Sequence, residues 1–178
     1  MKRKIILNLA MSIDGYIANE DGGFDWIVGD GDESLDTQNK WNYEKFLEGI
    51  DTVVMGKKCY DQGFVDDFKD KKVYIATSKE LEDYDNFHFI NGNICTIIEE
   101  ERKKERKKEG KDIFLFGGGV LVDSFLKADI IDEYIIGIIP TILGRGRPLF
   151  LGGTPKIDLH LQEYVSDKGI IILRYSKR

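Results

Sequence analysis

The chain has 178 residues, 42% of them hydrophobic, which is near the usual size of one domain and supplies enough apolar area for a single core. We therefore predict one domain over residues 1–178. Its 26 Lys and Arg against 32 Asp and Glu give a formal net charge of −6. That balance disfavours binding to nucleic acid, whose phosphates attract a positive surface.

The apolar segments and the cysteines indicate the compartment. The basic and apolar start of the chain is interrupted by Asn8 and Ser12, so it does not fit a signal peptide. No other apolar run approaches the roughly 18 residues of a membrane span. Cys59 and Cys95 stand outside any CxxC pair and fit a reducing compartment. We predict a soluble, cytoplasmic protein that binds no membrane and no transition metal.

The first predicted elements are a strand, a long loop and a helix. Residues 4–10 are mostly apolar, as in a buried strand. Residues 12–33 are rich in glycine and acids but keep aromatic and aliphatic side chains, so we expect an ordered loop, and long ordered loops are usually functional. Residues 39–48 carry apolar side chains at roughly helical spacing, and Gly49 fits the C′ position just after a helix.

The middle of the chain predicts three strands and one helix. The strands are short β-rich runs over residues 52–55, 73–76 and 87–90. Residues 93–110 predict a helix with favourable i,i+4 pairs between Glu99 and Lys103 and between Glu100 and Lys104. The helix carries five acids and six bases whose signs nearly cancel, which predicts a solvated face with no function of its own.

The last part of the chain alternates strands with a helix and then ends in strands. The predicted elements are a strand over 113–116, a helix over 120–128, and strands over 132–140, 158–166 and 169–175. Strands that alternate with helices and then follow one another predict an α/β fold of three layers (αβα). Its sheet is expected to be mainly parallel and to finish with an antiparallel hairpin.

Glycine is the one unusual count, about 11% of the chain where about 7% is typical, and three glycines stand together. Gly117, Gly118 and Gly119 lie between a predicted strand and a helix, an arrangement that exposes backbone N–H groups to a pyrophosphate. A tight turn that needs only positive φ is the alternative. Val122 stands where the dinucleotide-binding GxGxxG pattern needs its third glycine, so this is not a Rossmann motif.

Two further strand ends carry lysines and hydroxyl groups. They are Gly56, Lys57 and Lys58 after one strand, and Thr77, Ser78 and Lys79 after the next. Together they fit one phosphate held from two sides by ammonium and N–H groups, although each set alone also fits ordinary capping and solvated charge. The glycine spacing is wrong for a P-loop, and Lys58 stands in place of a magnesium-binding Ser or Thr, which argues against a phosphotransferase.

Several aromatic residues and one aspartate are candidates for contact with a planar ligand. The aromatic residues are Trp26, Trp41, Tyr43, Phe46 and Tyr60. Each also fits the hydrophobic core, but Trp26 lies in the glycine-rich loop, where a planar heterocycle would stack. Asp14 is either a turn residue or a polar contact to the ligand. His88 and His160 stand in no motif, so we assign no catalytic triad and no acid-base residue.

Four stretches, in this order, resemble the dihydrofolate reductase superfamily, and within it the branch of the C-terminal reductase domain of riboflavin-pathway deaminase-reductases. They are MSIDGYIA (residues 11–18), DTVVMGKKCYD (51–61), IFLFGGGVLVDSFLKADIIDEY (113–134) and IPTILGRGRPLF (139–150). The resemblance implies a mixed eight-stranded sheet flanked by helices, with NADPH across the strand ends. It also implies a homodimer, to which the apolar strand of residues 134–139 would contribute an interface.

The resemblance also assigns residues to the cofactor and to the substrate. The pyrophosphate would lie between Gly117, Gly118, Gly119, Val120 and Leu121 on one side and Gly56, Lys57 and Lys58 on the other. The 2′-phosphate, which implies NADPH and not NADH, would lie against Lys57, Ser78 and Lys79, with Thr77 beside them. The nicotinamide pocket would be lined by Ala10, Ile17 and Ala18. The substrate side would be formed by Asp14, Trp26, Trp41 and Phe46.

Two departures from the family bear on the activity. Cys59 stands where the family commonly has a phosphate-binding Thr, and the first helix lacks the carboxylate with which folate reductases bind and protonate the pterin; Asp36 and Glu44 are the nearest acids. The resemblance implies an NADPH-dependent reductase that transfers hydride to a small pterin- or pyrimidine-like heterocycle, with folate reduction itself disfavoured. The alternative is a nucleotide-binding or dimerisation module of the same fold without turnover.

Overall fold

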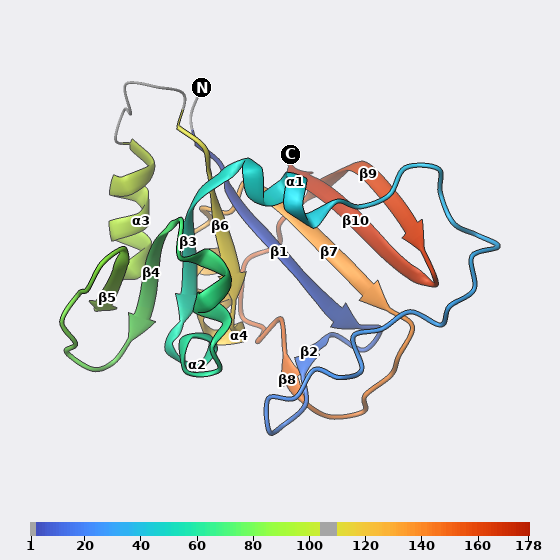
Figure 1. The fold of residues 1–178 in the computed structure, drawn as a ribbon, viewed down its shortest axis with the longest axis horizontal. Helices are drawn as coiled ribbons and strands as arrows, with labels where there is room; N and C mark the ends of the chain where they lie inside the picture. Colours follow the sequence, from blue (N-terminus) through green and yellow to red (C-terminus); the bar gives the residue numbers. More distant parts are fainter. Residues whose placement is uncertain (1–2, 104–109) are drawn as a thin grey trace.

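A mixed eight-stranded sheet runs through the centre of the protein (Figure 1). The computed structural model describes residues 3–103 and 110–178. In the order β5-β4-β3-β6-β1-β7-β10-β9, neighbouring strands are parallel up to β7, and the pairs β7–β10 and β10–β9 are antiparallel. The strands are β1 (Ile5–Ser12), β3 (Ile50–Gly56), β4 (Lys72–Thr77), β5 (Phe87–Asn91), β6 (Asp112–Gly117), β7 (Glu133–Ile139), β9 (Leu159–Asp167) and β10 (Ile170–Lys177). The predicted parallel sheet with its antiparallel hairpin is confirmed.

Helices cover both faces of the sheet. They are α1 (Tyr43–Glu48), α2 (Lys57–Asp61), the 3-10 helix η1 (Phe64–Phe68), α3 (Ile94–Lys103) and α4 (Gly119–Lys127). Successive strand residues point to opposite faces, so Ile6 packs with α1, α2 and η1, whereas Ile5 and Leu7 pack with α3 and α4. Figure 1 shows α1 and α2 in front of the sheet. The three predicted layers are therefore present, and no helix of the described ranges is long and apolar enough to cross a membrane.

The first helix is shorter than the ten residues predicted for it. The side chain of Asn42 accepts a hydrogen bond from the backbone N–H of Lys45 at 2.7 Å, and such a cap stabilises a helix that begins at the next residue, Tyr43. Gly49 is the C-cap residue itself and has right-handed backbone with φ of −79°. The predicted C′ role of Gly49 is therefore wrong.

Three short elements lie in segments for which no element was predicted. β2 (Tyr16–Ala18) and β8 (Arg147–Pro148) pair antiparallel outside the main sheet, and η1 follows α2 after a left-handed Gly63. Elements of two to five residues are too short for a periodic hydrophobic pattern.

The apolar strand predicted to contribute a dimer interface lies inside the sheet. Residues 134–139 belong to β7, which is hydrogen-bonded to β1 on one edge and to β10 on the other. Tyr134, Ile135 and Ile139 are buried. The prediction of an interface on this strand is wrong, because its apolar character reflects a strand covered on both faces by helices and loops.

Helix α3 buries two residues of its charge run, so the prediction of a solvated face is wrong for Glu101 and Arg102. The residues Ile94, Ile98, Glu101 and Arg102 are all buried, and they follow the i, i+4, i+7, i+8 spacing of one helix face. A carboxylate oxygen of Glu101 lies 3.6 Å from the Arg3 guanidinium. Glu101 also accepts hydrogen bonds from Lys72 Nζ and Tyr74 Oη, both at 3.0 Å.

Arg102 joins the same helix to the start of β7. Its guanidinium donates to the Asp132 carboxylate at 2.8 Å and to the Ile130 carbonyl at 3.3 Å. Glu99 pairs with Arg102 at i,i+3 spacing, where the sequence predicted an i,i+4 pair with Lys103. The predicted Glu100–Lys104 pair and residues 104–109 of the predicted helix lie outside the described residues.

Replacing Glu101 with Ala tests this buried ion cluster. The substitution leaves Arg3 and Lys72 without one of their counter-charges, and removing one partner of a buried pair typically costs about 3–5 kcal/mol of unfolding free energy. Urea denaturation measures the loss. The matched control is Glu100→Ala, because Glu100 is the preceding residue and is exposed; it should change the unfolding free energy by less than about 0.5 kcal/mol. Equal effects of the two substitutions would contradict the cluster.

Candidate functional site

The main sheet opens at the carboxyl ends of its central strands, between β1 and β6. These two strands pair only as far as Leu7 and Leu115, whereas β1 continues beside β7 as far as Ser12 and Ile139. A cavity of about 1130 Å³ lies at this opening. In Figure 1 the arrowheads of β1, β3, β4 and β7 point to this edge, where β2 and β8 lie. Open α/β sheets bind ligands at such an edge.

One end of the cavity is lined by the residues that follow β3 and β4. These strands are neighbours, with Gly56 opposite Ala76, so the two predicted lysine-bearing sets both line the cavity. Lys57 is paired with the Asp61 carboxylate. Lys58 and Lys79 are exposed and form no ion pair within the part of the chain that the structure describes. Their charges are therefore available to an anion.

The three glycines after β6 form the second wall of this end. Gly117 and Gly118 have φ of +126° and +101°, a region that favours glycine. A Cβ on Gly118 would have no heavy atom within 4 Å, whereas one on Gly119 would lie 2.5 Å from the carbonyl oxygen of Pro148 in β8. Gly119 thus allows close packing of α4 on β8, and Gly118 leaves open space. The N-terminus of α4 has no side-chain cap, so its N–H groups remain available.

Cys59 joins the two walls of the cavity's lysine end. Its Sγ donates to the carbonyl of Gly117 at 3.9 Å. Burial raises the pKa of the Cys59 thiol, which keeps it protonated and able to donate. The residue that departs from the family's Thr therefore contacts the glycine turn.

The other end of the cavity is aromatic. It is lined by Tyr43, the first residue of α1, by Trp41, which precedes the N-cap Asn42, and by Phe64, Phe114 and Phe116. The Phe64 and Phe116 ring centroids are 5.2 Å apart, and those of Phe114 and Phe116 are 5.6 Å apart. Burial raises the pKa of Tyr43 to about 12, so its hydroxyl is neutral at physiological pH. This end offers flat apolar surfaces to a planar ring.

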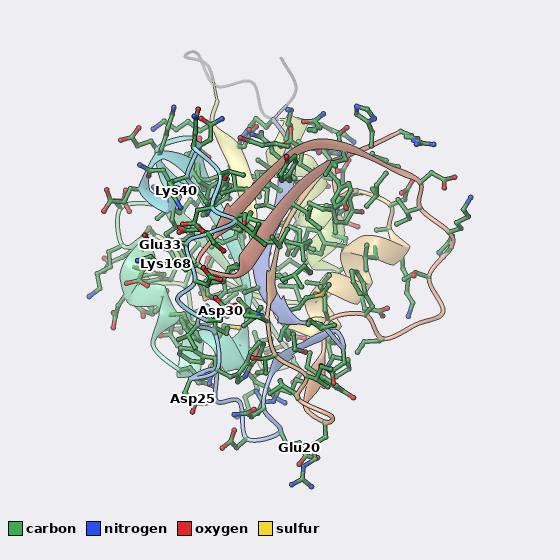
Figure 2. All side chains as sticks on the ribbon, turned by 90° about the vertical axis from the view of Figure 1, so that its right-hand side faces the viewer. Glu20, Asp25, Asp30, Glu33, Lys40 and Lys168 are labelled. Carbon is green, nitrogen blue, oxygen red and sulfur yellow. The ribbon has the colours of Figure 1, made fainter. Side chains whose placement is uncertain are left out.

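The long loop between β2 and α1 is held against the β9–β10 hairpin. The backbone N–H of Thr37 donates to the Ser166 carbonyl at 3.0 Å. Lys168 Nζ lies 3.3 Å from the Glu33 carboxylate, and Figure 2 shows these two residues beside each other. Gly29 packs on the Lys168 carbonyl, where any side chain would clash. The loop is thereby held in place as part of the cavity wall, to which it contributes Phe24 and Ile27.

All the predicted cofactor-binding residues except Gly117 line the cavity. They are Ala10, Ile17, Ala18, Gly56, Lys57, Lys58, Thr77, Ser78, Lys79, Gly118, Gly119, Val120 and Leu121. Gly117 instead supplies the backbone turn and the carbonyl that Cys59 contacts. The structure thus brings together residues that lie far apart in the sequence, because each set follows a different parallel strand that ends at the same edge.

Of the four residues predicted on the substrate side, only Trp41 lines the cavity. Phe46 lies behind it, with its ring centroid 5.8 Å from that of Trp41 and 5.1 Å from that of Phe114. Trp26 lies outside the cavity wall, and its indole nitrogen is buried with no hydrogen-bond partner in the described residues. Phe46 therefore supports the wall without forming it.

Asp14 holds a turn and does not line the cavity. Its carboxylate accepts hydrogen bonds from Ser12 Oγ at 2.6 Å and from the backbone N–H groups of Leu143 and Gly144 at 3.1 and 2.7 Å. These hydrogen bonds, that from Ser12 first, hold the pKa of Asp14 below its ordinary value. The geometry fits the turn-residue alternative.

Several residues of the cavity wall were not predicted as site residues. Among them are Asn8, Phe24, Gln62, Phe64, Phe116, Arg147 and Ile172. Two of them could have been recognised in the sequence. Asn8 interrupts an otherwise apolar strand, and Arg147 stands in the glycine-bearing GRGRP segment. The others lie in segments that sequence periodicity assigns to the core or to loops.

The charges of the cavity wall are all of one sign. Of the described residues, no Asp, Glu or His lines it, and its charged side chains are Lys57, Lys58, Lys79 and Arg147. No group of His, Cys, Asp and Glu within residues 3–103 and 110–178 is arranged to hold a metal ion. The cavity therefore combines a basic, glycine-lined end with an aromatic end that has no acid.

Comparisons with known proteins agree with this geometry. The RibD C-terminal domain family matches residues 3–171. The chain is 37% identical over 168 residues to the "Uncharacterized protein YwjB" of Bacillus subtilis (strain 168), and the alignment covers 91% of each chain. The structure of a "Putative riboflavin biosynthesis protein" from Shewanella sp. PV-4 has a TM-score of 0.77 and 26% identity over 100% of this chain and 99% of that one.

The fold is also similar to that of a dihydrofolate reductase. Dihydrofolate reductase from Enterococcus faecalis has a TM-score of 0.60 and 15% identity, over 100% of this chain and 99% of that one. At this identity the likeness concerns the fold alone, and it agrees with the mixed eight-stranded sheet and its helices. The family match over almost the whole described chain decides membership: the protein belongs to the RibD C-terminal domain family, with a dihydrofolate reductase-like fold.

Proposed function

We propose that the protein is an NADPH-dependent reductase that transfers a hydride to a pterin- or pyrimidine-like heterocycle. The observation that carries this proposal is the single cavity in which a basic, glycine-lined end continues into an aromatic end. A dinucleotide needs the first kind of surface for its phosphates, and a planar ring needs the second. Membership of a family whose related folds are reductases supports the same reaction class.

The residues at the basic end fit the phosphates of NADPH. The open space at Gly118 admits a pyrophosphate close to the backbone, and the uncapped N-terminus of α4 adds N–H donors. Lys79 and Ser78, exposed after β4, would bind the 2′-phosphate. Lys58 would neutralise the pyrophosphate, while Lys57 already has the Asp61 carboxylate as a partner.

The cofactor supplies the hydride, and the chain supplies position and a dry environment. Ala10, Ile17 and Ala18 line the cavity and would hold the nicotinamide beside the aromatic end. Reduction of a C=N bond also needs a proton. The described wall has no Asp, Glu or His, and burial raises the pKa of the Tyr43 hydroxyl to about 12. We therefore propose that water supplies this proton.

Cofactor and substrate assays test the proposal directly. NADPH should raise the thermal unfolding midpoint in a saturable manner and more than NADH or ATP does, because a ligand that binds only the folded state adds about 2.7 kcal/mol at a hundredfold excess over its Kd. NADPH should be oxidised when dihydrofolate or 5-amino-6-(5-phosphoribosylamino)uracil, the compound named for one structural neighbour, is added. Absence of saturable NADPH binding would contradict the proposal.

A non-catalytic nucleotide-binding or dimerisation module is the second candidate. The lack of any Asp, Glu or His in the described cavity wall favours it, because these side chains are the usual proton donors to a substrate. NADPH binding without oxidation in the presence of either heterocycle would support this candidate. The homodimer and the cytoplasmic location stay predictions.

Replacing Lys79 with Ala tests the 2′-phosphate site. Loss of a charge-assisted hydrogen bond should raise the Kd for NADPH about tenfold and leave the Kd for NADH unchanged, since NADH has no 2′-phosphate. Isothermal titration calorimetry with both nucleotides measures the ratio. Lys69→Ala is the matched control, because Lys69 is an exposed lysine outside the cavity that pairs with Asp66. An equal loss of affinity for both nucleotides would show that Lys79 does not bind the 2′-phosphate.

Replacing Gly118 with Ala tests the pyrophosphate site. The new Cβ would enter open cavity space, so the affinity for NADPH and for NADH should fall alike, by about tenfold or more if one phosphate contact is lost. The positive φ makes some loss of stability unavoidable. Gly31→Ala is the control, since Gly31 also has positive φ (+84°) and open space but lies outside the cavity; it should lower stability and leave nucleotide binding intact. Unchanged nucleotide binding by Gly118→Ala would remove this site from the proposal.

A further inference from the structure

Asn8 is a polar side chain at the point where the sheet opens. It is the first residue of β1 beyond the pairing with β6, which ends at Leu7 and Leu115, and it still pairs with Ile135 of β7. Side chains alternate along a strand, so Asn8 lies on the same face as Ile6, the face on which α1 and η1 pack. There it lines the cavity.

The amide of Asn8 has an unmet hydrogen-bonding capacity. Its Nδ2 atom is shielded from solvent and has no hydrogen-bond partner among residues 3–103 and 110–178. The cavity wall on this face is apolar, with Phe114 and Phe116 from β6 and Ile172 from β10. Buried amides in folded proteins nearly always have partners. Unlike the unpaired indole nitrogen of Trp26, the amide of Asn8 belongs to the cavity wall, where a bound ligand would complete its hydrogen bonds.

The chemistry of an amide restricts the kind of ring that fits. An amide offers an N–H donor beside a C=O acceptor, which matches the C=O and adjacent N–H of a lactam, such as the 4-oxo edge of a pyrimidine or pterin. A 4-amino ring presents a donor where the lactam has an acceptor, and it is more basic. Its protonated form needs a carboxylate partner, which no described residue of the wall supplies.

We propose that Asn8 determines substrate specificity by binding the lactam edge of the ring, so that the protein takes 4-oxo heterocycles and rejects their 4-amino counterparts. The proposal rests on the proposed function, because it takes the aromatic end of the cavity as the substrate site. In this arrangement the Asn8 amide rotates about χ2, a torsion that is broad and roughly two-fold, so that Nδ2 turns from its shielded position and donates to the ring carbonyl while Oδ1 accepts from the ring N–H. The aromatic side chains hold the faces of the ring, and Asn8 sets which of its edges points to β1.

Folate and aminopterin test this selection, because they differ only in an oxo or an amino group at ring position 4. Both are titrated into the full chain, with and without saturating NADPH. The wild type should bind folate at least about tenfold more tightly, as expected for a site built on one pair of buried hydrogen bonds. Asn8→Leu should lose most of this preference, because its affinity for folate falls. Asn8→Asp should shift the preference toward aminopterin, because a carboxylate accepts hydrogen bonds from the amino ring.

The stability of the variants separates a ligand-binding Asn8 from a structural one. Asn8→Leu removes an unpaired polar group from an apolar wall, so the Tm of the ligand-free protein should stay constant or rise by a few degrees. Asn86→Leu is the matched control, because the Asn86 amide donates to the carbonyls of Phe68 at 3.4 Å and Lys69 at 3.0 Å. That control should lower the Tm and leave the ratio of folate to aminopterin affinity unchanged.

Three results would overturn the role of Asn8. They are equal wild-type affinity for folate and aminopterin, unchanged folate affinity in Asn8→Leu, and no binding of either compound. Failure of the proposed function looks different, since it appears as a lack of saturable NADPH binding or of NADPH oxidation. The preference for folate is also measured without NADPH, so this measurement does not depend on NADPH binding or oxidation.

Discussion

The site depends on one break in the hydrogen bonding of the sheet, where β1 leaves β6 after Leu7 and Leu115 and stays with β7. A β6 that continued straight would extend this ladder and fill the opening. The chain turns away instead at Gly117 and Gly118, whose positive φ values are open to few other residues. Two successive glycines thus allow the turn at the end of β6, and a Cβ on Gly118 would enter the open space beside it.

Of the acidic residues that the structure describes, none lines the cavity, although the chain has a formal charge of −6. Asp14 holds the turn at Leu143 and Gly144, and Glu101 neutralises Arg3 and Lys72 beneath α3. The described cavity wall is left with basic groups alone. Such a separation attracts anions to one place on an otherwise acidic molecule, and it explains why net charge alone indicates little about the ligand.

The sequence was sufficient to predict the fold and the basic end of the cavity, for one reason. Parallel strands end at a common edge, so residues such as Gly56 and Gly118 can be placed together once the strands are recognised. The aromatic end could not be predicted in this way, because it depends on which side chains of the loop and of η1 turn inward. Nothing in the sequence around Trp26 and Phe64 indicates which of the two side chains turns inward, yet only Phe64 lines the cavity. The buried Glu101 was missed because a charge run has no pattern that reveals a buried partner such as Arg3.

The contact between the long loop and the C-terminal hairpin has a consequence for how the protein is made. The loop that carries Phe24 is held by Ser166 and Lys168, and β10 adds Ile170 and Ile172 to the cavity wall. A ribosome translates these hairpin residues after every other part of the wall. The basic end is lined by strands and turns that precede the hairpin, whereas the aromatic end also includes residues of β10. The two ends of the cavity thus depend on segments that are synthesised at different times, and the aromatic end depends on the last of them.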